Sequence, residues 1–123
     1  MKICITSQAG DMDAEVDQRF GRCQFFIIYD TDSLDSEFIP NSNKDGMGGV
    51  GIQAGQMMAD KGVDVVLTGN VGPNAYKTLE SGGIEVITGV SGKVLYAIDK
   101  YKRGELRSAE GPSVEPHFGG PGK

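Results

Sequence analysis

The chain has 123 residues, 38% of them hydrophobic, and a formal net charge of -5, which together fit one globular domain. Its sequence has no apolar run near the roughly 18 residues of a membrane helix and no basic-then-apolar leader, so we expect a soluble, cytoplasmic protein. The negative charge argues against binding to nucleic acid or to an anionic membrane. Two cysteines are too few for a disulfide framework and lack the Cys-x-x-Cys spacing of a zinc site.

The first part of the chain predicts three strands. Residues 1–6 alternate, with Ile3 and Ile5 on one side and Cys4 on the other. Residues 24–29 contain the run FFII, which is typical of a strand covered on both faces. Residues 37–40 form a short strand that ends at its proline, so the second and third strands are expected to make a hairpin.

The second part alternates helices and strands. Glycines at 46, 48, 49 and 51 lead into a helix with apolar residues at spacings of three and four, and Gly62 ends it. Strands are predicted at 63–67 and 84–87, with a helix beginning at Pro73 between them. Ser91 is the expected cap of a last helix, which stops before residue 104.

This order of elements, β-β-β-α-β-α-β-α, predicts the fold class. Parallel strands need right-handed helical crossovers, so the helices should cover a mixed five-stranded sheet in a three-layer α/β/α domain. We place one domain at residues 1–107. Residues 108–123 are rich in glycine and proline, offer little to a core, and are expected to form a flexible tail.

Three loops are candidates for a ligand site, at residues 17–23, 41–51 and 68–74. Ligands of open α/β sheets bind beyond the carboxyl ends of strands, and helix N-termini there attract anions. Two of these loops lead into helices, and Arg19 and Arg22 add positive charge. The physical inference is an anionic ligand, while glycines that serve only turns and arginines that are ordinary surface charges are the alternatives.

Other side chains give weaker signals. Neighbouring guanidinium groups could favour the Cys23 thiolate and make it a soft-metal ligand, although buried cysteines are more often inert, and Cys4 is expected in the core. Met12 and Met47 lie in predicted loops and are candidates for soft contacts. His117 stands alone in the tail, and the sequence has no nucleophile elbow or His-Glu-x-x-His helix, so we do not expect an enzyme.

Several segments together resemble the dinitrogenase iron-molybdenum cofactor biosynthesis family, in particular its small single-domain members. The resemblance spans residues 1–106. Its motifs are VDQRFGRC at 16–23 with the aromatic strand after it, an asparagine at 41 before the glycine loop, GVDVVLTG at 62–69, and Gly-Pro at 72–73 with GIEV at 83–86. The resemblance implies a ribonuclease H-like fold that binds or carries metal-sulfur clusters, including molybdenum-iron-sulfur and molybdenum-copper-sulfide species.

One position departs from the family pattern, because many relatives have a histidine where this chain has Arg19. A guanidinium stays protonated and cannot ligate a metal in the usual way, but it can hold a polyanionic thiometallate by charge and hydrogen bonds. Cys23 is then the candidate for direct ligation. The site implied by the resemblance comprises Arg19, Phe20, Gly21, Arg22, Cys23, Asn41, Gly48, Gly49, Gly69, Asn70 and Gly72.

The expected function is non-catalytic binding or carriage of an anionic, molybdenum-containing metal-sulfur cluster, with a cluster donor or acceptor protein as partner. A regulatory or protein-interaction module without a bound cluster is the alternative. A nuclease of the ribonuclease H-like fold is less favoured, because the first strand, KICIT at 2–6, offers no carboxylate for a metal.

Overall fold

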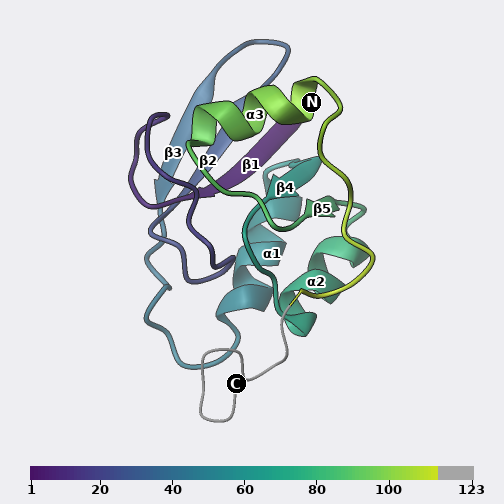
Figure 1. The fold of residues 1–123 in the computed structure, drawn as a ribbon. Coiled ribbons are helices and arrows are strands. Elements are labelled where there is room, and N and C mark those ends of the chain that lie inside the picture. Colours follow the sequence, from purple (N-terminus) through teal and green to yellow (C-terminus); the bar gives the residue numbers. More distant parts are fainter. Residues whose placement is uncertain (114–123) are drawn as a thin grey trace.

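The computed structural model describes residues 1–113; the predictions for His117 and the rest of 114–123 lie outside that part of the chain. The elements follow the predicted order (Figure 1). They are β1 (Lys2–Ser7), β2 (Phe25–Asp30), β3 (Ser36–Pro40), α1 (Val50–Asp60), β4 (Val65–Leu67), α2 (Pro73–Ser81), β5 (Glu85–Ile87) and α3 (Val94–Lys102).

The five strands form one mixed sheet in the order β3-β2-β1-β4-β5. The β1/β2 and β2/β3 pairs are antiparallel, whereas β1/β4 and β4/β5 are parallel. The predicted mixed five-stranded sheet and its hairpin are therefore confirmed. Because β1 and β4 are parallel neighbours, their carboxyl ends meet at one edge of the sheet, where loops can converge.

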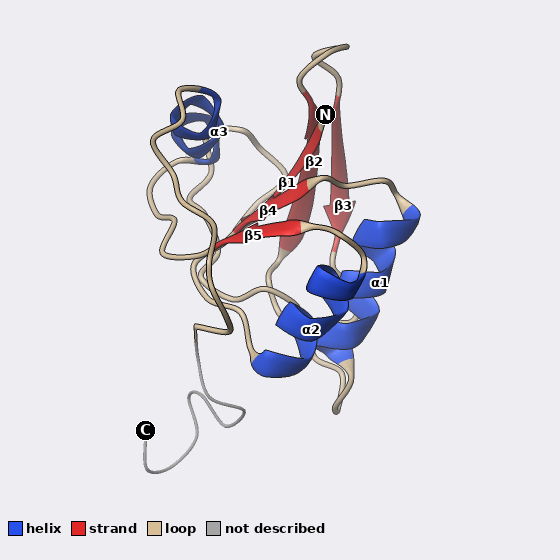
Figure 2. Ribbon diagram, turned by 90° about the vertical axis from the view of Figure 1, so that its right-hand side faces the viewer, coloured by secondary structure: helices blue, strands red, loops and turns tan. Residues whose placement is uncertain are grey.

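Helices cover both faces of this sheet, as Figure 2 shows with α3 on one side and α1 and α2 on the other. The alternation in β1 explains the two cores. Ile3 and Ile5 pack with the α3 residues Val94 and Ile98, whereas Cys4 faces the cluster that includes the α1 residue Met58. The three-layer α/β/α prediction is confirmed.

The start of α3 differs from the prediction, since its N-cap is Lys93 rather than Ser91. The reason is tertiary: Val94 N–H donates to the Ala14 carbonyl at 2.9 Å, and Leu95 N–H donates to the Met12 carbonyl at 3.0 Å. The loop before β2 thus accepts the first amides of the helix, as a serine side chain would otherwise do.

The chain after α3 returns along β5. Ala109 N–H donates to the Val86 carbonyl at 2.7 Å, and the Ser108 hydroxyl bonds to the Glu85 carboxylate. Further on, Ser113 Oγ accepts from Val71 N–H at 2.8 Å, and Ser113 N–H donates to the Val71 carbonyl at 3.0 Å. Residues 108–113 therefore contact both β5 and the loop after β4, while the flexibility of 108–123 stays a prediction.

Candidate functional site

The site begins with a pair of buried threonines at the carboxyl ends of β1 and β4. Thr6 Oγ1 donates to the Asp17 carbonyl at 2.7 Å, and the Thr6 and Thr68 hydroxyl oxygens are 2.7 Å apart. A hydroxyl has one proton, so the Thr68 hydroxyl must donate to Thr6. This chain of hydrogen bonds fixes the loop 17–24 to two neighbouring strands.

The same loop also pairs with the loop after β4. Arg19 and Asn70 form a parallel bridge, and Phe20 N–H donates to the Asn70 carbonyl at 3.1 Å. The Asn70 side chain donates to the Gln18 carbonyl at 3.2 Å. Two of the predicted loops, 17–23 and 68–74, are therefore brought together by main-chain and side-chain bonds.

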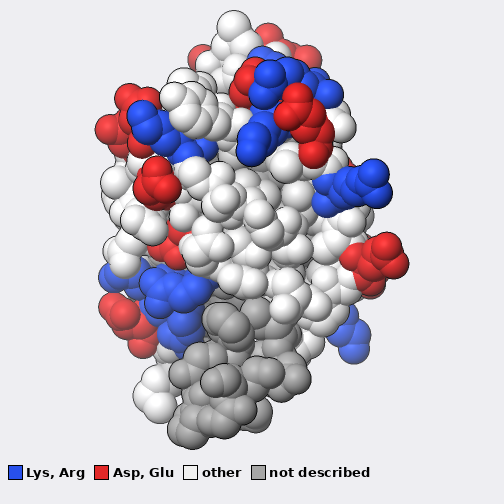
Figure 3. Space-filling view, viewed as in Figure 1, with Lys and Arg blue, Asp and Glu red and all other residues white. Residues whose placement is uncertain are grey.

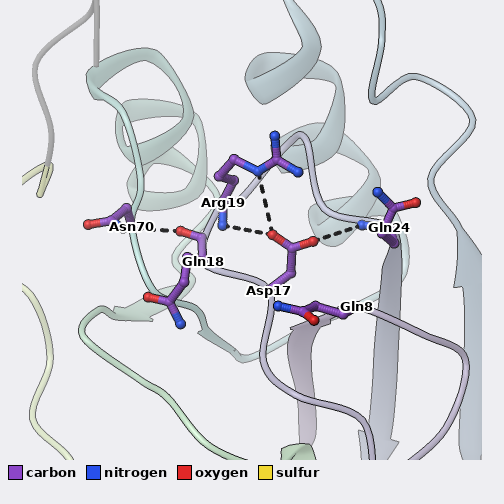
Figure 4. A pocket seen from close by; sticks show the side chains of 6 residues that line it. All are labelled: Gln8, Asp17, Gln18, Arg19, Gln24 and Asn70. Atoms are coloured by element: carbon purple, nitrogen blue, oxygen red, sulfur yellow. Dashed lines mark hydrogen bonds and ion pairs between the residues drawn. The ribbon is translucent and has the colours of Figure 1, made fainter. Parts of the chain in front are cut away.

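A pocket of about 550 Å³ lies where these loops meet. The side chains around it, drawn in Figure 4, come from the end of β1 and from both loops. They belong to Gln8, Asp17, Gln18, Arg19, Gln24 and Asn70. Its volume lies within the roughly 300–1,000 Å³ of small-molecule sites. Of the residues predicted for the site, Arg19 and Asn70 line it.

The Asp17 carboxylate is the most constrained group of the pocket. Its two oxygens accept hydrogen bonds from the main-chain N–H groups of Arg19, at 3.1 Å, and Gln24, at 3.2 Å, and one oxygen lies 3.6 Å from Arg19 Nε (Figure 4). The Asp17 side chain is 7% exposed, whereas that of Arg19 is 55% exposed. The Asp17 carboxylate thus joins the two ends of the loop 18–24 through main-chain hydrogen bonds, while the Arg19 guanidinium stays accessible to solvent.

Cys23 directly precedes the pocket residue Gln24 and is fully buried in the core. Burial, and then the negative charge of Asp17, raises the pKa of the Cys23 thiol to about 12. The Arg19 guanidinium does lower this pKa, but burial raises it more, so the thiol form is favoured and the interpretation of Cys23 as an inert buried cysteine is the better supported one. Direct ligation of a metal by Cys23 stays a prediction.

Asn41 holds this region together from the side of β3. Its amide nitrogen donates to the carbonyls of Gly21, at 2.8 Å, and Cys23, at 3.0 Å, and Asn41 itself is buried. Arg22 extends the link, since a terminal guanidinium nitrogen donates to the Lys44 carbonyl at 2.8 Å. Asn41 and Arg22 thus connect the loop 17–24 with the loop 41–49 through main-chain carbonyls.

The remaining predicted residues serve the surroundings of the pocket. Phe20 is in the core, with its ring edge-on to Phe26 at 5.8 Å between centroids. Gly21 has φ +91°, and a Cβ on it would lie 3.1 Å from Gly51 Cα. Gly69 abuts Gln18, while Gly48, Gly49 and Gly72 have open space where a Cβ would be, among the residues that the structure describes.

Sequence reasoning missed four residues that line the pocket, namely Gln8, Asp17, Gln18 and Gln24. Asp17 and Gln18 stand inside the motif at 16–23, and the spacing of Asp17 two residues before Arg19 suits a carboxylate that accepts a nearby main-chain N–H. The bond from Gln24 N–H bridges seven positions and has no such local signal.

The surface around these loops carries charges of both signs. Figure 3 shows Lys and Arg side chains gathered, with acidic side chains beside them, at the part of the molecule where the loop 41–49 lies in Figure 1. Within residues 1–113, His, Cys, Asp and Glu side chains form no group of three or more suited to hold a metal ion. In the same range, no helix is long and apolar enough to cross a bilayer.

The fold and this pocket define a class of protein, an α/β/α domain with a pocket lined by polar and charged side chains at the carboxyl ends of its central strands. The sequence model of the dinitrogenase iron-molybdenum cofactor family matches residues 1–104, and the chain belongs to this family. It is also 31% identical, over 94 residues, to an uncharacterised protein of Methanocaldococcus jannaschii, covering 74% of this chain and 80% of that protein.

Two solved structures share the fold and part of the sequence. The apo form of the orange protein from Desulfovibrio gigas superposes with a TM-score of 0.88 at 34% identity, over 92% of this chain and 96% of that one. A NifB-like protein from Thermotoga gives a TM-score of 0.77 at 36% identity, over 87% and 91% of the two chains. Both likenesses run through the pocket-bearing domain rather than a fragment of it.

Proposed function

We propose that this protein binds or carries an anionic metal-sulfur cluster and performs no catalysis on it. Its family and its likeness to the orange protein support a cluster-binding or carrier role. The observation that carries the proposal is the pocket itself, in which an accessible guanidinium and four carboxamides surround a volume of about 550 Å³.

The chemistry of the lining suits a thiometallate held without metal-protein bonds. Sulfides at the surface of such a cluster accept hydrogen bonds, and guanidinium and carboxamide groups donate them. Arg19 supplies the positive charge, and Asn70, Gln8, Gln18 and Gln24 supply neutral donors. The Cys23 thiol is buried and protonated at neutral pH, so the free protein does not present a thiolate to the pocket.

The proposed roles of the other residues follow from their contacts. Gly69 allows Gln18 to approach, and Asn41 and Arg22 hold the loops on which the donors stand. The proposed cargo is of the molybdenum-copper-sulfide or molybdenum-iron-sulfur type. The other predicted residues do not line the pocket, and we propose that they shape the loops around it rather than contact the cargo: Phe20, Gly21, Cys23, Gly48, Gly49 and Gly72. A donor or acceptor protein and a cytoplasmic location stay predictions.

The test is anaerobic incubation with tetrathiomolybdate, with and without copper(I), followed by desalting, a visible spectrum and elemental analysis. The proposal expects molybdenum to elute with the protein in stoichiometric amount. Co-elution of copper with new absorption bands would select the mixed-metal cargo. If the protein elutes without either metal, iron-containing clusters are tested next, and failure there would favour the protein-interaction alternative.

A matched pair of variants locates the binding. Arg19→Ala removes the accessible guanidinium of the pocket, and Arg103→Ala removes an exposed arginine at the end of α3, outside the pocket lining. We expect Arg19→Ala to lose the thiometallate on desalting and Arg103→Ala to retain it. Equal retention in both variants would contradict a role for this pocket.

A further inference from the structure

The pocket contains a group that works against an anionic cargo. Among its lining residues Arg19 carries the positive charge, Asp17 carries a negative one, and the rest are neutral amides. A carboxylate repels an anion at short range, and more strongly where solvent is displaced. Asp17 is 7% exposed, so water screens it poorly. Its presence needs an explanation beyond loop structure.

The two charged groups differ in how firmly they are held. Main-chain N–H groups of Arg19 and Gln24 fix the Asp17 carboxylate in place. In contrast, the Arg19 guanidinium approaches Asp17 only to 3.6 Å at Nε, which is longer than a hydrogen bond, and its side chain is 55% exposed. The long Nε contact and the solvent-exposed guanidinium leave the arginine free to turn toward a ligand, while the carboxylate stays in place.

Resting on the proposed function, we propose that Asp17 competes with the anionic cargo for the Arg19 guanidinium and thereby sets how tightly the cargo is held. The empty pocket keeps Arg19 beside Asp17. A bound anion draws the guanidinium away or shares its donors with the carboxylate. On release the arginine returns to Asp17, so the buried carboxylate regains its counter-charge. This regained ion pair lowers the free energy needed to release the cargo. A carrier has to let go of its cargo, and this pair supplies the means.

The test measures the affinity of tetrathiomolybdate for four proteins under anaerobic conditions, namely wild type, Asp17→Asn, Arg19→Ala and the double variant. Asp17→Asn is expected to tighten binding roughly five-fold, the worth of one weak ion pair. In the Arg19→Ala background the same change should tighten binding less. An equal gain in both backgrounds would show simple repulsion and overturn the competition.

A control separates the pocket from net charge. Asp45→Asn removes the same charge from an exposed side chain that pairs with Lys44 at 3.3 Å, outside the pocket lining. Its affinity should match that of wild type. If Asp45→Asn tightens binding as much as Asp17→Asn does, the effect belongs to overall charge and the inference is overturned.

A measurement on the wild-type protein tests the inference even if the Asp17→Asn variant does not fold. The nuclear magnetic resonance signal of Arg19 Nε–H should shift when tetrathiomolybdate is added, because the guanidinium leaves the Asp17 carboxylate and contacts the anion. An unmoved signal in a protein that binds the anion would overturn the inference. Failure of the wild type to bind would instead overturn the proposed function, and the inference with it, whereas binding without tightening in Asp17→Asn overturns the inference alone.

Discussion

Two loops that lead into helices use their glycines differently. In the loop after β4, a Cβ on Gly69 would lie 2.7 Å from Gln18 Cα, closer than real contacts allow. In the loop before α1, Gly48 and Gly49 both have φ +71°, with open space around them in the described part of the chain. The first glycine permits two segments to touch at the pocket, whereas the other two satisfy only the backbone angle of a turn. Loops of similar composition thus differ in whether they shape the pocket.

The largest effect is expected from Gly69→Ala, which attacks the close contact directly. The added methyl must push Gln18 and the loop 17–24 away from β4, so overpacking should cost about 1–3 kcal/mol of unfolding free energy. The pocket wall would move with it. Urea unfolding and thiometallate retention measure the two effects, and a variant with normal retention would show that the approach of these loops does not matter for binding.

A loss of similar size is expected from Asn41→Ala, which removes the side chain that joins the two loops. The carbonyls of Gly21 and Cys23 would each lose a buried hydrogen bond, and the two bonds together contribute about 1–3 kcal/mol. Chemical denaturation gives the value. For comparison, Asn43→Ala alters an exposed asparagine of the same loop, and a loss as large there would contradict the assigned role of Asn41.

Cys23, at the same junction, should make the protein less stable in alkali. Burial raises its folded pKa from an ordinary value of 9.0 to about 12, so above pH 9 the unfolded chain releases a proton that the folded protein keeps. Stability therefore falls as pH rises from 9 toward 12, by up to about 1.4 kcal/mol per pH unit for this thiol. Cys23→Ala should show a shallower fall over that range in urea unfolding. Parallel slopes for the two proteins would refute the buried, protonated thiol.

The smallest effect is expected from Gly48→Ala. A non-glycine residue in the left-handed region costs about 1–2 kcal/mol, and the open space makes a steric clash absent among the described residues. Gly48→Asn should recover part of that cost, because asparagine adopts this conformation more readily. Retention of the thiometallate is expected to stay normal in both. Impaired retention would mean that this loop contacts the cargo after all.

The fold was predictable because local patterns agree with the tertiary arrangement. Ile3 and Ile5 alternate with Cys4 in sequence, and the structure places them in opposite cores. The start of α3 was missed because carbonyls from Met12 and Ala14, more than seventy positions away, replace a side-chain cap. The sequence around Ser91 contains no signal of such a long-range hydrogen bond.

The pocket was predictable in part for the same reason. Arg19 and Asn70 stand in loops that strand order brings to one edge of the sheet, and charge marks the arginine as a candidate. Asp17 could not be singled out in the same way, because its burial depends on Thr6 and Gln24, which only the folded chain brings to it. Carboxamide residues such as Gln8 carry no charge and follow no periodic pattern, so nothing in the sequence distinguishes them from other surface residues.

Two hydrogen bonds between Ser113 and Val71 tie the end of the described chain to the loop that carries the pocket residue Asn70. Val71 stands next to Asn70, and Ser113 engages both its N–H and its carbonyl. The family model matches residues 1–104, so Val71 lies within that match and Ser113 lies after it. Hydrogen–deuterium exchange at the Val71 amide should be slow while these bonds hold and should accelerate in Ser113→Ala. The exchange rate of this one amide would therefore report how firmly the chain at residue 113 holds the loop that carries Asn70.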